Sequence, residues 1–218
     1  VYMREDGMIL RQVVLATSSN YSPAGQATTD GISSGSSSDN SVTVTGKSFQ
    51  QKTDANGLVA MNAKNHSART GRGNHNWAAV NHLGVGAMEA MPDNGARINT
   101  NYVSKSPYLR FNVNFKKTGI HYIWLRASCL GRDNTAHVGL NGKAVASAAR
   151  VNLPVSKGWG WSGKTISGSR VKINVTKTGV QTLEVYMRED GMVLHKMVIA
   201  KSSSYKPSGG GPAQSVLK

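Results

Sequence analysis

The sequence predicts an all-β protein, an antiparallel β-sandwich of the jelly-roll type. Apolar and polar residues alternate from Tyr108 to Phe115, which is typical of a strand with one buried face. Asn141 and Gly142 lie between two strand-like runs and indicate a tight hairpin. Helical periodicity is hard to find, and Gly, Pro and Asn separate about eight or nine short apolar runs, as in sandwiches and jelly rolls.

The individual strands follow from the same pattern in chain order. In the stretch YLRFNVNF, we expect one buried face made of Leu109, Phe111, Val113 and Phe115, and an opposite face made of Tyr108, Arg110, Asn112 and Asn114. Further strands are predicted at Leu58–Met61, Val85–Met91, Ile120–Arg126, Val171–Val175, Val180–Met187 and Met192–Ala200. Trp124 lies within one of these runs, so we expect it in the core.

A long repeat defines the domain organisation. Val1–Gly25 recurs as Val185–Gly209, with 16 of 25 aligned residues identical. An offset of 184 residues is far longer than the solenoid unit of about 20–50 residues, so it indicates tandem globular modules. We therefore expect residues 1–25 to be the C-terminal remnant of a preceding module. Residues 26–48 are expected to be a flexible linker rich in Ser, Thr and Gly, and residues 49–215 one complete domain.

Charge is concentrated in the expected domain. The whole chain has a net charge of +15, and residues 51–218 hold 23 basic and seven acidic side chains. Such a surface attracts polyanions, among which are nucleic acid, acidic lipid and acidic polysaccharide, although solubility alone is an alternative reason for the charge. Cys129 is the single cysteine, so no disulfide forms within the chain and the redox compartment is left open. Long apolar runs are absent, which argues against a membrane span.

The sequence offers no catalytic machinery. Glycosidases need two carboxylates facing each other across a cleft, and the adjacent Glu189 and Asp190 would point to opposite sides of an extended strand. Nucleophile-elbow, zinc-protease and phosphate-loop motifs are missing. The histidines lack the spacing of metal ligands: His66, His75, His82, His121, His137 and His195. We therefore predict a protein that is not an enzyme and carries no cofactor.

The tryptophans point to ligand binding instead. Trp77, Trp159 and Trp161 lie among Gly, Asn and Ser, outside the clean strand alternations, so we expect them in loops. A loop tryptophan flanked by amides suits stacking on a flat ligand face, which both sugar rings and nucleic-acid bases offer. The alternative is that Trp159 or Trp161 folds back as a plug over the open end of the sandwich.

Several motifs resemble a known family. The stretches LVAMNAKNHS, SPYLRFNVNF, TGIHYIWLRA, DNTAHVGLNG and GWGWS, followed by the R-E-D-G motif and Y-x-P-S-G-x-G-P-A-x-S, occur in order over residues 49–215. They are similar to β-sandwich carbohydrate-binding modules related to families 6 and 35. The version at the C-terminus of family 115 glycoside hydrolases, and in multimodular marine polysaccharide-degrading enzymes, is especially similar. The resemblance implies a sugar-binding domain without catalysis that holds an attached enzyme on its substrate.

The resemblance also implies a ligand site in the loops at one end of the sandwich. The matching positions are His75, Trp77, Asp133, Asn134, Trp159, Trp161, Arg188, Glu189 and Asp190. In that site the tryptophans would stack on sugar rings, and the amide, carboxylate and arginine groups would fix the orientation of the ligand.

Three departures from the family concern a structural calcium. Related modules carry Glu-Ala-Glu on the first strand and Asp on the last, whereas here Asn62, Lys64 and His195 stand at the three acidic positions. Calcium prefers several anionic oxygen ligands, so we predict that no metal binds there. We expect the Lys64 ammonium to occupy the vacant cation position; a solvent-facing lysine is the alternative.

Together these features predict a secreted module that binds an acidic or sulfated polysaccharide, with a red-algal galactan (agar, porphyran or carrageenan) as the expected ligand. The expected partner is a covalently linked glycoside hydrolase or polysaccharide lyase. Neutral agarose or a plant glycan stays open, since tryptophans also bind uncharged sugars. A nucleic-acid-binding β-domain is the second interpretation, which we disfavour because the basic residues look dispersed rather than gathered with aromatics on one sheet face. A structural or adhesion repeat without a ligand is the third.

Overall fold

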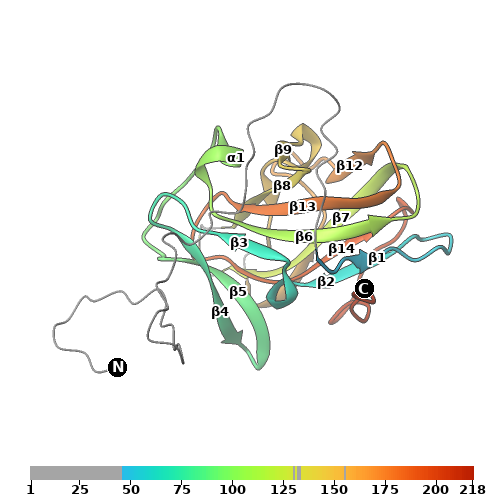
Figure 1. Ribbon diagram of the computed structural model, residues 1–218. Coiled ribbons are helices and arrows are strands. Elements are labelled where there is room, and N and C mark those ends of the chain that lie inside the picture. Colours follow the sequence, from blue (N-terminus) through green and yellow to red (C-terminus); the bar gives the residue numbers. More distant parts are fainter. Residues whose placement is uncertain (1–45, 130, 132–133, 155) are drawn as a thin grey trace, which may run out of the picture. The chain divides into compact units, whose positions relative to one another are not determined.

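The computed structural model describes residues 46–129, 131, 134–154 and 156–218. Two sheets pack face to face, which confirms the predicted antiparallel β-sandwich (Figure 1). The expected repeat remnant (1–25), the expected linker up to residue 45, and Asp133 lie outside the described residues. Within the described part, no helix has the length and apolar character of a membrane span.

The first sheet has β13 at its centre, hydrogen-bonded to β6 on one side and β8 on the other. The pairings are antiparallel except for β1, which runs parallel to β6. Its strands are β1 (Phe49–Gln50), β3 (Ala68–Thr70), β6 (Tyr108–Phe115), β8 (Thr135–Leu140), β9 (Lys143–Ala144), β10 (Val151–Asn152) and β13 (Gly179–Met187).

The second sheet is built on β7 and β14, which pair antiparallel along most of their lengths. Two short strands extend it, since β12 pairs with the start of β7 and β2 with the end of β14. Its strands are β2 (Val59–Asn62), β4 (Asn76–His82), β5 (Val85–Met91), β7 (Gly119–Cys129), β11 (Ser156–Ser162), β12 (Lys172–Val175) and β14 (Val193–Ala200).

One hydrophobic core lies between the two sheets. Alternate residues of β6, from Leu109 to Phe115, are fully buried and face Ile123 and Leu125 of the second sheet, as the sequence pattern predicts. The predicted hairpin is also confirmed: Asn141 and Gly142 both have positive φ, the conformation that a two-residue turn of this kind requires.

Short helices and the C-terminal segment complete the domain. The 3₁₀ helices η1 (Ala63–Asn65) and η2 (Ala146–Ala148) join strands. The short helix α1 (Tyr102–Lys105) contributes Tyr102 to a cluster with Tyr108 and Tyr186. The last residues return to the start of the domain, where Ser48 and Lys218 exchange two backbone hydrogen bonds. The β-structure therefore extends past residue 215, the end expected from the sequence.

Two tryptophans lie where the sequence analysis did not expect them. Trp77 is on strand β4 and fully buried in the core, so the prediction that it is a loop residue free to stack on a ligand is wrong. Trp124 is half-buried on the outer face of the second sheet, because Ile123 and Leu125 on either side of it point into the core. The prediction that Trp124 belongs to the core is therefore also wrong.

Candidate functional site

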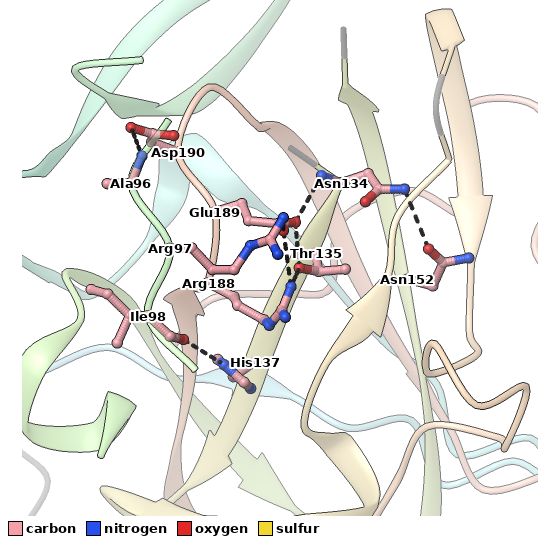
Figure 2. Close-up of polar contacts among 10 residues, drawn as sticks. All are labelled: Ala96, Arg97, Ile98, Asn134, Thr135, His137, Asn152, Arg188, Glu189 and Asp190. Carbon is pink, nitrogen blue, oxygen red and sulfur yellow. Dashed lines mark hydrogen bonds and ion pairs between the residues drawn. The ribbon is translucent and has the colours of Figure 1, made fainter. Parts of the chain in front are cut away.

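Five of the expected site residues come together at one end of the sandwich. They belong to the turn before β4 (His75), the start of β8 (Asn134) and the loop that joins β13 to β14 (Arg188, Glu189 and Asp190). A loop between β5 and α1, containing Ala96 and Arg97, packs against them (Figure 2). Gly191 closes the β13–β14 loop with φ +71°, and an added Cβ there would lie 2.6 Å from the Asp93 side chain.

Glu189 forms the centre of the first polar network. Its Oε1 accepts from Arg97 Nη2 at 2.7 Å and from Arg188 Nη1 at 3.0 Å. Its Oε2 accepts from the Thr135 hydroxyl at 2.6 Å and from the Asn134 backbone N–H at 3.1 Å (Figure 2). The side chain of Glu189 is 3% exposed, so both of its carboxylate oxygens bind groups of the protein rather than solvent.

Asp190 forms the centre of the second network. Its Oδ2 accepts from the backbone N–H groups of Asn94 at 2.9 Å and Ala96 at 3.0 Å, and it contacts His75 Nε2 at 3.1 Å. Burial by itself raises the pKa of Asp190, but the two N–H groups and the imidazole outweigh it and the pKa is lowered. Burial lowers the pKa of His75, but its bonds to Gly73 O and to Asp190 outweigh this and the pKa is raised. The pair is thus favoured in its charged form.

These contacts determine what the expected loop residues do. Arg188, Glu189, Asp190 and His75 are each at least nine-tenths buried and bound to one another's loops. We therefore assign them to the support of the loops rather than to contact with a ligand. Asn134 is half-buried, and its amide donates to Asn152 Oδ1 (Figure 2). Glu189 and Asp190 point to different partners, so they do not form the facing carboxylate pair of a glycosidase.

A basic cavity of about 420 Å³ opens beside these loops. Arg72, Arg97 and Lys105 contribute cationic side chains to its wall, and His75 and Ser104 are among its other lining residues. Half of the Arg97 side chain is exposed although its guanidinium binds Glu189. This end of the sandwich is therefore a positively charged hollow without an aromatic side chain in its lining.

Trp159 and Trp161 lie elsewhere, on strand β11 of the second sheet, so the prediction that they are loop residues is wrong. The ring of Trp159 contacts His82 edge-on, with centroids 5.2 Å apart, and lies 5.4 Å from the ring of His195. Trp161 is opposite Arg126 in the β11–β7 register, and its Nε1 donates to Gly209 O at 3.0 Å. The structure thus separates the two tryptophans from the loop residues with which the resemblance grouped them.

The outer face of the second sheet carries more aromatic and basic side chains that the sequence analysis did not identify. On β7, Tyr122, Trp124 and Arg126 alternate with the buried Ile123 and Leu125 and so point outward together. That alternation was available in the sequence HYIWLRA as a signal. With Trp159, Trp161 and Arg170 they make a half-buried set that we call the aromatic stripe, defined as Tyr122, Trp124, Arg126, Trp159, Trp161 and Arg170.

Arginine guanidinium groups lie over the rings of the aromatic stripe. The Arg126 guanidinium carbon lies 5.1 Å from the Trp159 ring centroid. The Arg170 guanidinium carbon lies 4.8 Å from the Trp124 centroid and 5.2 Å from that of Tyr122. Such cation–π contacts order both partners and leave a surface that combines flat apolar faces with positive charge. Two of the 23 basic residues of residues 51–218, Arg126 and Arg170, thus lie with aromatic rings on one sheet face, which the sequence pattern did not predict.

The residues at the usual calcium positions do not fit a metal. Lys64 is exposed and its aliphatic part lies against Gly86, which fits the alternative of a solvent-facing lysine rather than an ammonium in the vacant cation position. Backbone carbonyls instead bind the ammonium of Lys196, which donates to Gly210 O at 3.0 Å and Pro212 O at 2.8 Å. Burial and the nearby Arg126 lower the pKa of His195 to about 4. In the described part of the chain, His, Cys, Asp and Glu do not group in threes as a metal would need.

Comparisons with known proteins give one family match. The family model of the glycosyl hydrolase family 115 C-terminal domain matches residues 53–214. A protein of Formosa agariphila, described as uncharacterized protein P23, is 32% identical over 111 residues. That match covers 47% of this chain and only 27% of the relative.

Solved structures with similar folds include two modules and one larger enzyme. The CBM35 of Paenibacillus barcinonensis has a TM-score of 0.48 and 14% identity, covering 66% of this chain and 99% of that one. The C-terminal CBM6 of LamC from Zobellia galactanivorans has a TM-score of 0.44 and 13% identity, covering 66% and 99%. The GH26-CBM35 β-(1,4)-mannanase of Podospora anserina has a TM-score of 0.47 and 16% identity, covering 69% and 29%.

Proposed function

The chain belongs to the family of glycosyl hydrolase family 115 C-terminal domains, and we propose that it is a non-catalytic module that binds polysaccharide. The observation that carries the proposal is the aromatic stripe. Four large rings from β7 and β11 share one outer sheet face, where a soluble sandwich ordinarily presents small polar side chains. A sugar ring offers a flat C–H face for stacking on such rings and hydroxyls for the arginines beside them.

The charge of the module indicates an acidic ligand. Residues 51–218 carry 23 basic against seven acidic side chains, and both Glu189 and Asp190 are already bound within the end loops. The module therefore has a positive electrostatic field, which attracts an anionic polysaccharide as it approaches. Red-algal galactans such as carrageenan and porphyran, which carry sulfate esters, are the first ligands to test, and neutral agarose is the comparison.

The family to which the chain belongs supports a role beside an enzyme. We propose that the module holds a covalently linked glycoside hydrolase or polysaccharide lyase on its substrate outside the cell. The module itself supplies binding only, because the described end-loop carboxylates have separate, buried partners.

The test is a glycan array with carrageenan, porphyran, agarose and plant glycans, run beside single-stranded DNA and RNA. We expect binding to a polysaccharide without release of reducing sugar. Trp159→Ala or Trp161→Ala should weaken that binding by about 1–3 kcal/mol, by analogy with the stacking of a nucleic-acid base on an aromatic side chain. Val180→Ala, which trims an exposed apolar side chain of the first sheet, is the matched control and should bind as the wild type does.

A nucleic-acid-binding domain is the second candidate, and the arginines packed on the aromatic stripe favour it. Bases stack on aromatic rings as sugars do, and arginine suits phosphate. The same array separates the two: binding to the oligonucleotides alone, weakened by the same tryptophan variants, would replace the polysaccharide proposal. Reducing-sugar release that disappears in Glu189→Gln would instead contradict the absence of catalysis.

A further inference from the structure

A second and larger cavity lies at the edge of the sandwich, apart from the end loops. Its volume is about 680 Å³, and it lies between the segment around η2 and the connection from β11 to β12. The first wall joins strands of the first sheet, and the second wall joins strands of the second sheet. Tyr122 and Arg170 line the cavity and also belong to the aromatic stripe, so cavity and stripe are continuous.

Hydrogen bonds hold the two walls together. The Asn152 N–H donates to Lys164 O at 2.9 Å, and the Ile166 N–H donates to Arg150 O at 3.0 Å. The Ser147 hydroxyl donates to Lys172 O at 2.7 Å. These bonds cross from one wall to the other, so the shape of the cavity is set by backbone positions rather than by mobile side chains.

The cavity is lined by positive charge without a compensating carboxylate. Arg150 and Lys172 are exposed at its walls, and Arg170 is half-buried. Within the described part of the chain none of these three forms an ion pair, and none of the residues that line the cavity is acidic. Three cations held close together without a counter-charge repel one another, so an anion placed among them is stabilised.

Hydrogen-bond donors accompany the charge. The Arg170 guanidinium lies over the rings of Tyr122 and Trp124, with Nε and Nη2 covered from solvent and Nη1 donating to Ser203 O at 3.3 Å, so this side chain contributes positive charge rather than free donors. The hydroxyls of Thr165, Ser167 and Ser169 form a chain along the same wall, with Oγ–Oγ distances of 2.8 and 3.4 Å. The exposed guanidinium of Arg150 and these hydroxyl groups suit the several oxygens of a sulfate ester or a carboxylate.

We propose that this cavity, defined by Arg150, Thr165, Ser167, Ser169, Arg170 and Lys172, binds the anionic substituent of a polysaccharide whose sugar rings stack on the adjoining aromatic stripe. This proposal rests on the proposed function and adds the site at which the module recognises the charged substituent of the polysaccharide. Tyr122 and Ile166, which is half exposed, provide apolar contact for the sugar that carries the substituent.

The experiment compares the affinity of the module for carrageenan, for the same polymer after chemical desulfation, and for polygalacturonate. The pocket variant is Arg150→Gln with Lys172→Gln, two exposed residues outside the aromatic stripe, and the charge-matched control is Lys52→Gln with Lys116→Gln, two exposed lysines outside the cavity. Because a hydrogen bond to a charged group is worth a factor of about ten or more, we expect the pocket variant to bind carrageenan about tenfold more weakly. The control should lose less than about twofold, since exposed charges act through a screened field.

Each outcome separates the two proposals. Loss of carrageenan affinity in the pocket variant, with unchanged binding of the desulfated polymer, supports a sulfate subsite; the same pattern with polygalacturonate supports a carboxylate subsite. Equal losses in pocket and control variants, or none in either, overturn the subsite while leaving polysaccharide binding in place. A wild-type module that binds no polymer overturns the proposed function itself. Lys172→Gln alone, an exposed substitution, repeats the test if the double variant does not fold.

Discussion

His137 lies beneath the loop that carries Ile98, stacked on Tyr102 with ring centroids 3.9 Å apart. Its Nε2 donates to Ile98 O at 3.2 Å (Figure 2). Its Nδ1 accepts from the Arg150 N–H at 3.1 Å, and only the neutral ring satisfies both bonds. Burial, the largest effect, together with Arg188 and Arg150, lowers the pKa of His137 to about 4. Protonation of Nδ1 would bring its N–H against the Arg150 N–H and break the hydrogen bond between Arg150 and His137.

The pH dependence of stability follows from that shift. The pKa of His137 is lower in the folded chain than in the unfolded one, so its contribution is complete above about pH 6.5 and is lost as pH falls toward 4. We expect the free energy of unfolding to fall by on the order of 3 kcal/mol over that range from His137 alone. Urea unfolding at a series of pH values measures how the free energy of unfolding depends on pH. His137→Gln should flatten the profile, and equal slopes for variant and wild type would contradict the assignment.

Lys196 places a positive charge beside the C-terminal segment. Its ammonium is bound by Gly210 O and Pro212 O, so we expect Lys196→Met to lower the free energy of unfolding by about 1–3 kcal/mol. Lys64→Met, which keeps the aliphatic contact with Gly86, is the matched control and should leave stability unchanged. For the wild type, excess chelator should not alter Tm in thermal unfolding. A drop of several degrees would show a bound metal and overturn this account.

At the scale of single elements, strands with clean alternation were predictable and irregular ones were not. Strand β6 and the Asn141–Gly142 hairpin follow directly from the pattern of apolar residues and turn residues. Strand β11 was missed because it is rich in Gly and its pairing with β7 shifts register between Ser156 and Gly160. Gly160 is needed there, since an added Cβ would lie 2.6 Å from Pro154.

The candidate site was predictable only in part, for a related reason. The motif of Arg188, Glu189 and Asp190 identified an important loop, but a sequence does not reveal that its charges are turned inward. Which tryptophan faces solvent depends on the face of the sheet to which its position in the strand directs it. Trp77 on β4 packs into the core and Trp124 on β7 faces outward, the reverse of what their neighbours in sequence suggested.

We therefore expect different effects of alanine substitution at the tryptophans of β4 and β11, one mainly on stability and the other mainly on binding. Trp77→Ala removes a fully buried ring, so we expect it to lower the free energy of unfolding by about 3–5 kcal/mol, with binding retained by the molecules that remain folded. Trp161→Ala removes a half-buried ring, and we expect a smaller loss of stability together with weaker binding. Denaturant unfolding beside affinity electrophoresis measures both. A Trp77→Ala variant as stable as the wild type would contradict the placement of this ring in the core.

At the scale of the whole molecule, charge and the aromatic stripe act together on the ligand. The positive field of residues 51–218 acts over a distance that salt shortens to roughly 10 Å at 0.1 M, whereas stacking is insensitive to salt. For a sulfated polysaccharide we expect affinity to fall several-fold as salt rises from low concentration to about 0.5 M. Titration calorimetry at stepped salt measures this. Affinity that is independent of salt would contradict recognition of an anionic ligand and indicate a neutral glycan.

The most direct test of the central claim, that the aromatic stripe binds polysaccharide, is a ¹H–¹⁵N titration that follows the indole N–H signals of the four tryptophans. The tryptophans report on different parts of the molecule, since Trp77 is in the core whereas Trp124, Trp159 and Trp161 belong to the stripe. With carrageenan oligosaccharides, we predict progressive shifts of the Trp159 and Trp161 signals and an unchanged Trp77 signal. Shifts confined to backbone amides around Arg72, Arg97 and Lys105, with every indole signal unmoved, would place the ligand in the end-loop cavity and contradict the account.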